Sequence, residues 1–351
     1  MEIRLVNNQE LERKWQSYLQ EHPQKSIYHT LKWRNLLKQE YDFKDKYLIA
    51  IKEEKVAGIL PLFEIKNLSG KKLISIPCSQ FGGDLSDNID VTKKFLQFIL
   101  NKKKEWDFDK VVIKENRKVE EKIRDFEIRN ELLVCSLKTN ESFELVKKNF
   151  SRNKRRTFKK AQDGNLSWKF CESEEELRKI YNLEVDLRKK QGVPIPSYQY
   201  FKSIYQNFGN ENQLKIILTK DQKNEILAAE FYFTYNKEAL NAYSVTHKPK
   251  YNPISPITFV QWQQIKVCSE DEKIDKVVYG TTDIHEKNIL QFKQKWGSQC
   301  QEISTLYHPP KSNLTSSTKQ GVLYKIFRKI LKIIPKPIFR FTGKYIIKYL
   351  V

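Results

Sequence analysis

The sequence has few glycines and no cysteine pattern typical of a metal site. Only 11 of its 351 residues are glycine, and its 5 cysteines are dispersed, with no Cys-x-x-Cys pair. An odd, dispersed set is typical of reduced thiols in a cytoplasmic protein, so we expect neither a metal site nor a disulfide framework. The cysteines are Cys78, Cys135, Cys171, Cys268 and Cys300.

Long apolar runs are also lacking. Residues 1–7 contain charged side chains and no apolar core of ~7–15 residues, so no secretory signal is expected there. No uninterrupted apolar run reaches the roughly 20 residues that a membrane-spanning helix needs. We therefore expect a chain that neither carries a secretory signal nor crosses a membrane.

The composition that is present is globular and strongly basic. Hydrophobic residues make up 39% of the chain and aromatic residues 12%, and its length allows two domains with separate cores. The net charge of +21 favours polyanionic partners such as nucleic acid, anionic lipid or a nucleotide-linked substrate. An AT-rich genome, which enriches Lys, Asn and Ile together, is an alternative explanation for the charge of the body of the protein.

Hydrophobic periodicity predicts helices alternating with strands, which indicates a mixed α/β layer fold. In the first half we predict helices over 8–21, 31–40 and 91–103 and strands over 47–51, 56–64, 73–76 and 110–114. In the second half we predict strands over 168–171, 214–219, 226–235, 239–245 and 276–280. Helices are predicted there over 174–191, 197–208, 257–268 and 288–295. A hairpin is predicted through Asn236 and Lys237.

The chain divides into four predicted parts. Residues 1–148 form a first α/β domain and residues 165–310 a second one. Between them, residues 149–164 read as a basic connecting helix that Gly164 ends. Residues 311–351 differ in composition, with a polar linker followed by a basic, apolar-rich tail.

The most specific motif is Tyr279–Gly297, YGTTDIHEKNILQFKQKWG, which follows a short apolar strand. Its second half resembles a late segment of the FemAB-like transferases, where a helix carries Phe-Lys and Trp-Gly. The first half departs from the family, because the Arg expected at the strand end is Thr281 here. The resemblance covers roughly residues 25–308 and implies two tandem GNAT-like acyltransferase domains.

Two further segments resemble the family. In Ala57–Leu85, a Leu-Pro-Leu strand leads to Ser-x-Pro and a Gly-Gly turn, and the resemblance implies substrate binding by Gly82, Gly83 and Asp84. An ordinary tight turn with a capping Asp is the alternative. In Arg188–Pro196, Lys189 before Gly-x-Pro is implied to line the acyl channel. The alternative is a helix C-terminus whose cations interact with its dipole.

Lys293 and Glu230 are the candidate catalytic residues. A Lys293 cation near an acyl carbonyl would stabilise the developing oxyanion, with Phe292 and Trp296 as an apolar wall. The alternative is a surface lysine on a helix that packs through those rings. Glu230 interrupts an apolar strand and is a candidate general base, unless strand alternation places it in solvent. Other predicted substrate-binding residues are Tyr243, for which a core position is equally compatible, Gly280, Thr282 and Trp296.

The acyl donor is predicted from two features, the absence of a glycine-rich turn and the cluster of basic residues in the connecting helix. Coenzyme A-dependent GNAT enzymes usually have a glycine-rich turn whose amides bind pyrophosphate at a helix N-terminus, and here Pro253 and Pro256 precede the corresponding helix. This pattern favours a donor held by a charged surface, as aminoacyl-tRNA would be. The basic helix is suited to phosphate contacts, through Arg152, Arg155, Arg156 and Lys159.

The tail from Lys311 onward contains Lys and Arg but no Asp or Glu. Apolar residues recur at near-helical spacing up to Ile334, and Pro335 and Pro337 interrupt the helix before a second apolar segment. Such basic amphipathic helices lie in the membrane interface, which we predict here. The alternative is packing on the body of the protein or on a partner subunit.

Together these features predict an N-acyltransferase that moves an aminoacyl group from tRNA to an amine on a peptidoglycan or surface-glycan precursor. The acceptor would be lipid- or nucleotide-linked, and the protein peripheral at the cytoplasmic face of the membrane. No cofactor or metal is expected. The first alternative is a coenzyme A-dependent N-acyltransferase acting on an amino sugar in polysaccharide synthesis. The second is a non-catalytic, membrane-tethered RNA-binding protein.

Overall fold

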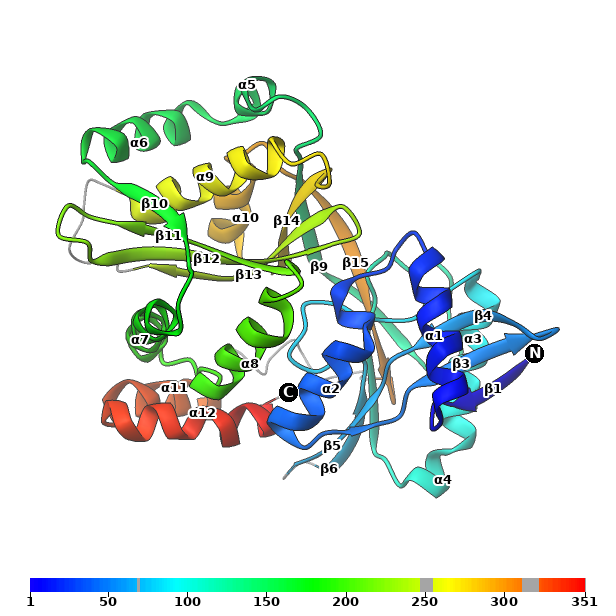
Figure 1. Ribbon diagram of the computed structural model, residues 1–351. Helices are drawn as coiled ribbons and strands as arrows, with labels where there is room; N and C mark the ends of the chain where they lie inside the picture. The colour runs from blue at the N-terminus through cyan, green and yellow to red at the C-terminus, as the bar shows by residue number, and fades with distance from the viewer. Residues whose placement is uncertain (68–69, 247–254, 311–321, 351) are drawn as a thin grey trace. The chain divides into compact units, whose positions relative to one another are not determined.

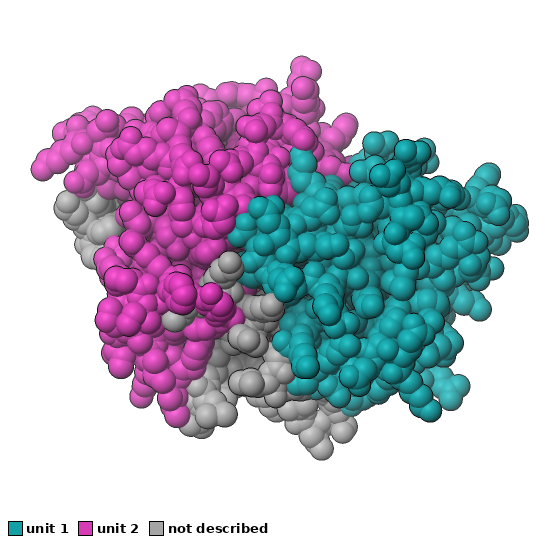
Figure 2. All heavy atoms as spheres, turned by 60° about the horizontal axis from the view of Figure 1, so that its bottom comes forward, with its two compact units in different colours: residues 1–133, 302–315, 348–351 teal, residues 134–301, 316–347 magenta. Residues whose placement is uncertain are grey.

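The computed structural model describes residues 1–67, 70–246, 255–310 and 322–350. The chain divides into two compact units (Figure 2). Unit 1 comprises residues 1–133, 302–315 and 348–351, and unit 2 comprises residues 134–301 and 316–347. Strands β9 (Glu127–Lys138) and β15 (Gln299–His308) carry the chain from one unit to the other, so unit 1 contains segments that are distant in sequence.

Unit 1 contains a sheet with the strand order β1-β3-β4-β7, in which neighbouring strands run antiparallel. Helices α1 (Gln9–Glu21) and α3 (Ile89–Asn101) pack against it, and the side chains of Asn8 and Asn88 cap their first turns. The strands span Glu2–Leu5, Leu48–Lys52, Lys55–Leu60 and Leu85–Ser86. Helix α2 (Leu31–Tyr41) is capped by Thr30.

A second set of strands in unit 1 comprises β2 (Lys44–Asp45), β5 (Phe63–Asn67), β6 (Gly70–Ile74) and β8 (Lys110–Lys114). β5 pairs antiparallel with β2 and β6, whereas β6 and β8 are parallel. The core between these strands and α3 is apolar and includes Leu73, Phe95, Ile99, Val111 and Leu306. A short helix, α4 (Lys103–Trp106), follows α3.

Unit 2 is built on five consecutive sheet neighbours, β10 to β14. They span Ser167–Phe170, Leu214–Lys220, Ile226–Tyr235, Glu238–Thr246 and Lys276–Asp283. β10 to β13 are antiparallel, whereas β13 and β14 are parallel and pair over Glu238–Leu240 and Lys276–Val278. The predicted β12–β13 hairpin is confirmed, with positive φ at Asn236 and Lys237.

Helices cover both faces of this sheet (Figure 1). α9 (Pro256–Ser269) packs on one face, where α6 (Arg152–Asp163) covers it, and α7 (Glu174–Gln191) and α8 (Tyr198–Gly209) lie on the other. A serine side chain caps each of these four helices, at Ser151, Ser173, Ser197 and Ser255. An aromatic cluster that includes Phe150, Phe158, Trp262 and Trp296 fills the core under α6 and α9.

The predicted elements differ from the structure at several points. The strand predicted over 56–64 is two strands, β4 and β5, in different sheets, because Pro61 has no N–H to continue the ladder. β14 continues past Gly280 to Asp283. Strands β1, β9 and β15, and the short helix α5 (Phe143–Val146), were not predicted.

The expectation that all cysteines are reduced is wrong for one pair. Cys135 in β9 and Cys300 in β15, both in unit 2, form a disulfide. Because these strands are neighbours in the sheet, two residues 165 positions apart become adjacent, which spacing alone cannot indicate. The other three cysteines are free, and burial raises the pKa of Cys78 and Cys268 to about 12 and that of Cys171 to about 11, which keeps them protonated.

The tail forms two helices, α11 (Val322–Ile333) and α12 (Lys336–Leu350), separated at Pro335. In unit 2, α11 packs on α7, and Leu331 and Phe339 are buried. Packing on the body, the alternative considered above, therefore accounts for one face of the tail. Among the described residues no helix is long and apolar enough to cross a membrane.

Candidate functional site

Glu230 lies in the interior of unit 2 and not in solvent. In β12 it is paired with Ser244 of β13, beside an irregularity in the register at Phe231 and Tyr232. Its side chain is fully buried, and its carboxylate accepts hydrogen bonds from Ser244 Oγ at 2.8 Å and Gln261 Nε2 at 3.3 Å. Burial raises the pKa of Glu230 to about 8, and the hydrogen bonds oppose that shift. Such a carboxyl can gain or lose a proton near neutral pH.

Lys293 lies in the last turn of α10 (Lys287–Gln294) and is 8% exposed. Its Nζ donates to the carbonyl oxygen of Gly280 at 2.8 Å and to that of Thr281 at 3.4 Å. Gly280 has a φ of 71° in the middle of β14, a conformation that glycine adopts without strain. Burial lowers the pKa of Lys293 to about 8, whereas the charge of Glu230 raises it. The two candidate catalytic residues therefore act electrostatically on each other.

Gln261 connects this pair to the core, and the sequence analysis did not identify it. From the buried side of α9 it donates to Glu230 and accepts from the Trp296 Nε1–H at 3.1 Å. Trp296 is fully buried, with Phe150 and Trp262 packed edge-on against its ring. Trp296 thus fixes Gln261, and through it Glu230, from the core. Gln261 is one of three glutamines in α9, PITFVQWQQIKVCS, so the sequence gives no signal that singles it out.

Two polar groups of β14 are buried without a hydrogen-bond partner among the described residues. They are the hydroxyls of Tyr279 and Thr282, which flank Gly280 and Thr281 in sequence. Buried polar atoms without partners are costly and are concentrated at functional sites. Of the two β14 residues predicted to bind substrate, Gly280 contacts the Lys293 ammonium through its carbonyl oxygen, and Thr282 carries one of the two unpartnered hydroxyls.

Lys154 of α6 adds a second buried amine. Its Nζ lies 3.6 Å from the centroid of the Phe292 ring and 4.2 Å from that of Trp296, and the residue is buried. Burial, with a smaller contribution from Lys295, lowers the pKa of Lys154 to about 7. The rings stabilise the ammonium by cation–π attraction, but they do so less effectively than a carboxylate would. The Phe-Lys motif is therefore in contact with the basic helix.

The other predicted basic residues face outward. Lys154, Phe158 and Ala161 form the buried stripe of α6. Its exposed face carries all four residues predicted to bind phosphate, Arg152, Arg155, Arg156 and Lys159. Arg155 donates to the backbone carbonyl of Lys148 at 3.3 Å, and the first turn of α6 contains no acidic residue. The helix combines a cationic outer face with an inner face near Lys293.

Tyr243 and Lys189 lie elsewhere in unit 2. Tyr243 is opposite Phe231 in the sheet, and its hydroxyl donates to that of Tyr200 at 3.4 Å, within an aromatic group that includes Phe201. Lys189 donates to the carbonyl oxygen of Lys332 in α11. It therefore contacts the tail at the end of α7, where Gly192 has a φ of 65°.

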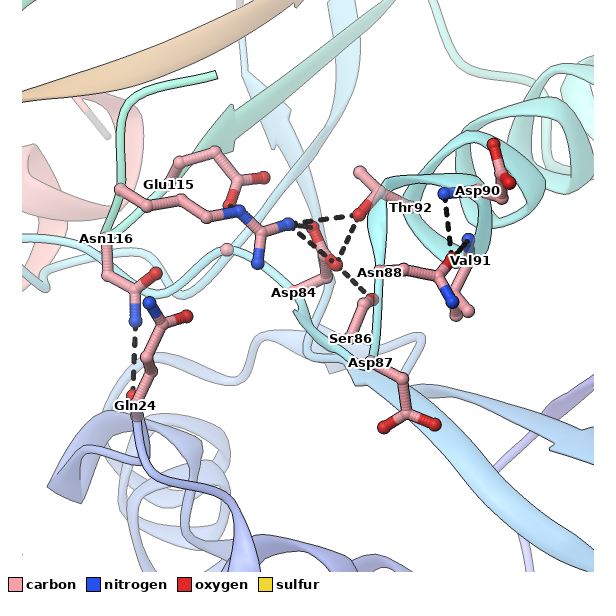
Figure 3. Close-up of polar contacts among 12 residues, drawn as sticks. Gln24, Asp84, Ser86, Asp87, Asn88, Asp90, Val91, Thr92, Glu115 and Asn116 are labelled. Carbon is pink, nitrogen blue, oxygen red and sulfur yellow. Dashed lines mark hydrogen bonds and ion pairs between the residues drawn. The ribbon is translucent and has the colours of Figure 1, made fainter. Parts of the chain in front are cut away.

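The predicted residues of unit 1 form a second buried polar cluster (Figure 3). Asp84 is 1% exposed and accepts hydrogen bonds from Ser86 Oγ, from Thr92 Oγ1 at 2.8 Å and from Arg117 Nη2 at 3.3 Å. Thr92 also accepts from Arg117 at 3.0 Å. The carboxylate of Asp84 is thus paired with a cation and held by two hydroxyls.

Glu115, which the sequence analysis did not identify, lies beside Gly83. It is fully buried, and a Cβ on Gly83 would lie 2.5 Å from its carboxylate, so only glycine fits there. Neither oxygen has a hydrogen-bond partner among the described residues, and Arg117 Nε is 4.0 Å away. Burial and the nearby charge of Asp84 raise the pKa of Glu115 well above its ordinary value. Gly82, with a φ of 151°, would clash with Ile76 if it carried a side chain.

In the described part of the chain, His, Cys, Asp and Glu form no group that could hold a metal ion. Some of the predicted site residues thus gather in two clusters, one in each unit, whereas Tyr243 and Lys189 belong to neither. Gly82, Gly83 and Asp84 belong to unit 1, whereas Glu230, Lys293, Gly280 and Thr282 belong to unit 2. Pro253, on which part of the donor argument rests, lies outside the described residues.

Comparisons with known proteins connect this geometry to a fold family. Residues 147–288 match the family model described as Acetyltransferase (GNAT) domain. The chain is similar to the crystal structure of FemX, with a TM-score of 0.69 at 13% identity, over 93% of this chain and 100% of that chain. A comparison with curated proteins found no match.

Two other solved structures show the same fold. A tandem GNAT protein from the clavulanic acid biosynthesis pathway has a TM-score of 0.55 at 9% identity, over 89% of this chain and 100% of that chain. The C-terminal domain of a putative lysylphosphatidylglycerol synthetase from Agrobacterium fabrum has a TM-score of 0.52 at 10% identity, over 87% and 94%. These findings support the predicted acyltransferase class. The chain has the predicted α/β fold of tandem GNAT-like domains seen in FemX, residues 147–288 match an acetyltransferase (GNAT) domain model, and the FemAB-like resemblance is confirmed at the level of the fold.

Proposed function

We propose that the protein transfers an aminoacyl group from aminoacyl-tRNA to an amine of a cell-envelope precursor. The observation that supports this proposal most directly is the buried Glu230–Lys293 pair of unit 2. A carboxyl whose pKa is raised to about 8 and an amine whose pKa is lowered to about 8 can act as base and cation at the same pH.

In the proposed reaction the acceptor amine attacks the ester carbonyl carbon of the donor. A new C–N bond forms, and Lys293 stabilises the negative charge that develops on the carbonyl oxygen. Glu230 accepts the proton that the amine loses. The C–O bond to the ribose then breaks, and Glu230 returns that proton to the ribose oxygen, which leaves as a hydroxyl. Ester aminolysis is downhill, so correct positioning supplies much of the rate.

The donor is proposed to be tRNA because of α6. Its exposed face carries the four cations named above, whereas its buried face brings Lys154 to the Phe-Lys motif. Phosphate contacts from such a face are independent of sequence and sensitive to salt. Substituting Arg155, Arg156 and Lys159 with Glu should therefore weaken tRNA binding and flatten its salt dependence. An unaltered salt slope would exclude this face as the tRNA contact.

A coenzyme A-dependent N-acyltransferase acting on an amino sugar is the second candidate. It is favoured by the match to an acetyltransferase (GNAT) domain and by the similarity to a tandem GNAT protein whose structure is described as lacking AcCoA. The two candidates differ in the donor and share the catalytic pair of unit 2. A donor test therefore separates them whichever acceptor takes the acyl group.

The acceptor is proposed to be a peptidoglycan or surface-glycan precursor linked to lipid or nucleotide. Similarity to a domain of a putative lysylphosphatidylglycerol synthetase supports an aminoacyl transfer near lipid. The tail supports membrane attachment, since it is basic and exposes apolar side chains on both helices, at Ile326, Ile330, Ile333, Ile338, Phe341 and Tyr345.

The proposed location is the cytoplasmic face of the membrane, where aminoacyl-tRNA is present. Disulfides are rare in reducing compartments, so the Cys135–Cys300 disulfide is unexpected for a protein at this location. Substituting exposed Ile333 and Phe341 with Asp, which leaves buried Leu331 and Phe339 intact, should move the protein to the soluble fraction of cells. Continued membrane association would refute attachment through the tail.

The decisive experiment supplies the purified protein with a membrane-precursor extract and one of two labelled donors, an aminoacyl-tRNA pool or acetyl-CoA. Label entering an alkali-stable amide from tRNA supports the proposal, whereas transfer from acetyl-CoA alone supports the second candidate. Lys293→Ala is the control for catalysis. A non-catalytic RNA-binding protein would show no transfer from either donor, and its tRNA affinity would be unchanged by that substitution.

A further inference from the structure

The tail is fixed to α7 by polar contacts as well as by its buried side chains. Lys336 Nζ pairs with Asp186 at 2.7 Å, and Arg328 Nη2 donates to the carbonyl oxygen of Gln191 at 2.6 Å. Gly343 lies so close to Ile195 that a Cβ there would clash with its carbonyl oxygen. One face of the tail is therefore committed to unit 2, and only the opposite face is available to a partner.

The available face is an apolar stripe. On α11 the exposed large apolar residues are three and four positions apart, at Ile326, Ile330 and Ile333, and on α12 they are Ile338, Phe341 and Tyr345. Ile333 is 79% exposed and Phe341 is 69% exposed, which is unusual for large apolar side chains. The tail contains no acidic residue that would repel an anionic surface.

A cavity in unit 2 opens beside this stripe. It lies among α7, α8 and α12 and is lined by Arg178, Tyr181, Asn182, Tyr198, Pro337, Arg340 and Phe341. Phe341 belongs to both the cavity and the stripe, so a cationic cavity and an apolar surface are continuous. We refer to these seven residues as the tail cavity.

The two arginines of the tail cavity are incompletely neutralised. Arg340 Nη2 donates a hydrogen bond to the neutral amide oxygen of Asn182 at 2.9 Å, and no carboxylate of the described residues pairs with Arg340. Arg178 lies 4.2 Å from the Tyr198 ring centroid and 3.9 Å from Glu174, a carboxylate that also pairs with Lys202 at 3.0 Å. Two guanidinium groups with N–H donors to spare suit a phosphate group, which arginine binds through paired hydrogen bonds.

We propose that the tail cavity binds the phosphate of an anionic membrane lipid whose hydrocarbon chains lie along the apolar stripe. This inference rests on the membrane attachment proposed above and adds a specific lipid-phosphate site to it. The argument is the continuity of the two surfaces. A soluble phosphate would use the arginines alone, whereas a lipid uses both the arginines and Phe341 with Ile338.

The test measures binding of the full-length protein to two kinds of vesicle with equal surface charge, both made of digalactosyldiacylglycerol, a neutral lipid without phosphate. One contains phosphatidic acid and the other an anionic fatty acid whose head group is a carboxylate. Arg178→Gln/Arg340→Gln is compared with Lys325→Gln/Lys329→Gln, which removes the same charge from exposed positions of α11. Either pair should weaken binding about 25-fold by electrostatics, at roughly fivefold per charge near the surface.

On phosphatidic acid vesicles the arginine pair should weaken binding about tenfold more than the lysine pair. On carboxylate vesicles the two pairs should weaken binding equally. Equal effects on both vesicles would overturn the lipid-phosphate site and leave membrane attachment intact. If the unsubstituted protein binds neither vesicle, the proposed membrane attachment fails as well.

Two controls separate the site from tail docking and from soluble phosphate. Asp186→Asn breaks the ion pair that docks Lys336 on α7 and keeps all seven residues of the tail cavity, so binding should be retained. A loss as large as that of the arginine pair would mean that undocking of the tail is responsible, and would overturn the site. Millimolar inorganic phosphate that raises the melting temperature through these arginines without vesicles would assign the cavity to a soluble ligand instead.

Discussion

Both units bury carboxylates, but the two clusters balance their charge differently. In unit 1, Asp84 is paired with Arg117 and held by two hydroxyls. In unit 2, Glu230 has only neutral hydrogen-bond donors among the described residues, and Lys293 donates to backbone carbonyls. The ion pair of unit 1 has the features of an arrangement that maintains structure. In unit 2, burial brings the pKa values of Glu230 and Lys293 to about 8, so both groups can exchange protons near that pH.

This difference indicates what each cluster contributes. An arginine in contact with a buried carboxylate compensates its charge and holds it in one position, as Arg117 does for Asp84. A carboxyl and an amine that burial has brought to similar pKa values, as in unit 2, can instead exchange protons during a reaction. Burying an ionisable carboxyl and an ionisable amine costs free energy of folding. A role in a reaction would explain why unit 2 keeps these two groups in its interior.

The largest expected effect is on unit 1. Arg117→Met should lower the free energy of unfolding by about 3–5 kcal/mol, because Asp84 would remain buried without a compensating cation. Chemical denaturation at pH 7 measures this loss. Lys118→Met, which breaks the exposed ion pair with Glu302, is the matched control and should cost less than about 1 kcal/mol. Equal losses would mean that the cluster of unit 1 is not held by its arginine.

In unit 2 the corresponding change should affect catalysis. Lys293→Ala should lower kcat about 10²–10³-fold, the effect of removing one group that stabilises an oxyanion. Lys295→Ala, two residues further along and exposed, should leave kcat within about twofold. The assay is label transfer from the donor identified above. A Lys293→Ala protein with full activity would assign the lysine to packing of α10.

Glu230 predicts a pH dependence. If Glu230 accepts a proton and Lys293 acts as a cation, the rate rises as the carboxyl deprotonates and falls as the ammonium does. Since both pKa values lie at about 8, a plot of kcat against pH should be a narrow bell-shaped curve centred near pH 8. The two apparent pKa values of that curve describe the coupled pair and not either residue alone. Glu230→Gln should lower kcat about 10²-fold and remove the acidic limb. An unchanged profile would contradict Glu230 as the base.

A stability measurement on Glu230→Gln excludes unfolding as the cause. The folded state holds the Glu230 proton up to about pH 8, whereas the unfolded state releases it near 4.5. The unsubstituted protein therefore loses stability as the pH rises through this interval. The Gln variant lacks this loss, so it should be at least as stable at pH 8 while being less active.

The fold was more predictable from the sequence than the site was. α7 and β12 were predicted within their exact bounds, because Ser173 caps a periodic segment and β12 is a long run of apolar and aromatic residues interrupted at Glu230 and Thr234. β15 was missed because its exposed first half and buried second half show no regular alternation. Gln261 and Glu115 were missed because a polar residue inside an apolar segment does not indicate which distant residue it contacts.

The smallest expected effect concerns Lys154, whose charge is balanced by two rings and not by a carboxylate. Its pKa is about 7 in the folded state and ordinarily 10.5, so between these values the unfolded state binds more protons. Stability should therefore rise with pH across this interval, and Lys154→Met should lack that contribution. The difference between the two proteins should change by about 2 kcal/mol between pH 7 and pH 9. Denaturation curves at both pH values measure it, and Lys293 cancels because both proteins retain it. Parallel curves would show that Lys154 stays charged, as a lysine with a carboxylate partner would, and would remove the contrast with Arg117.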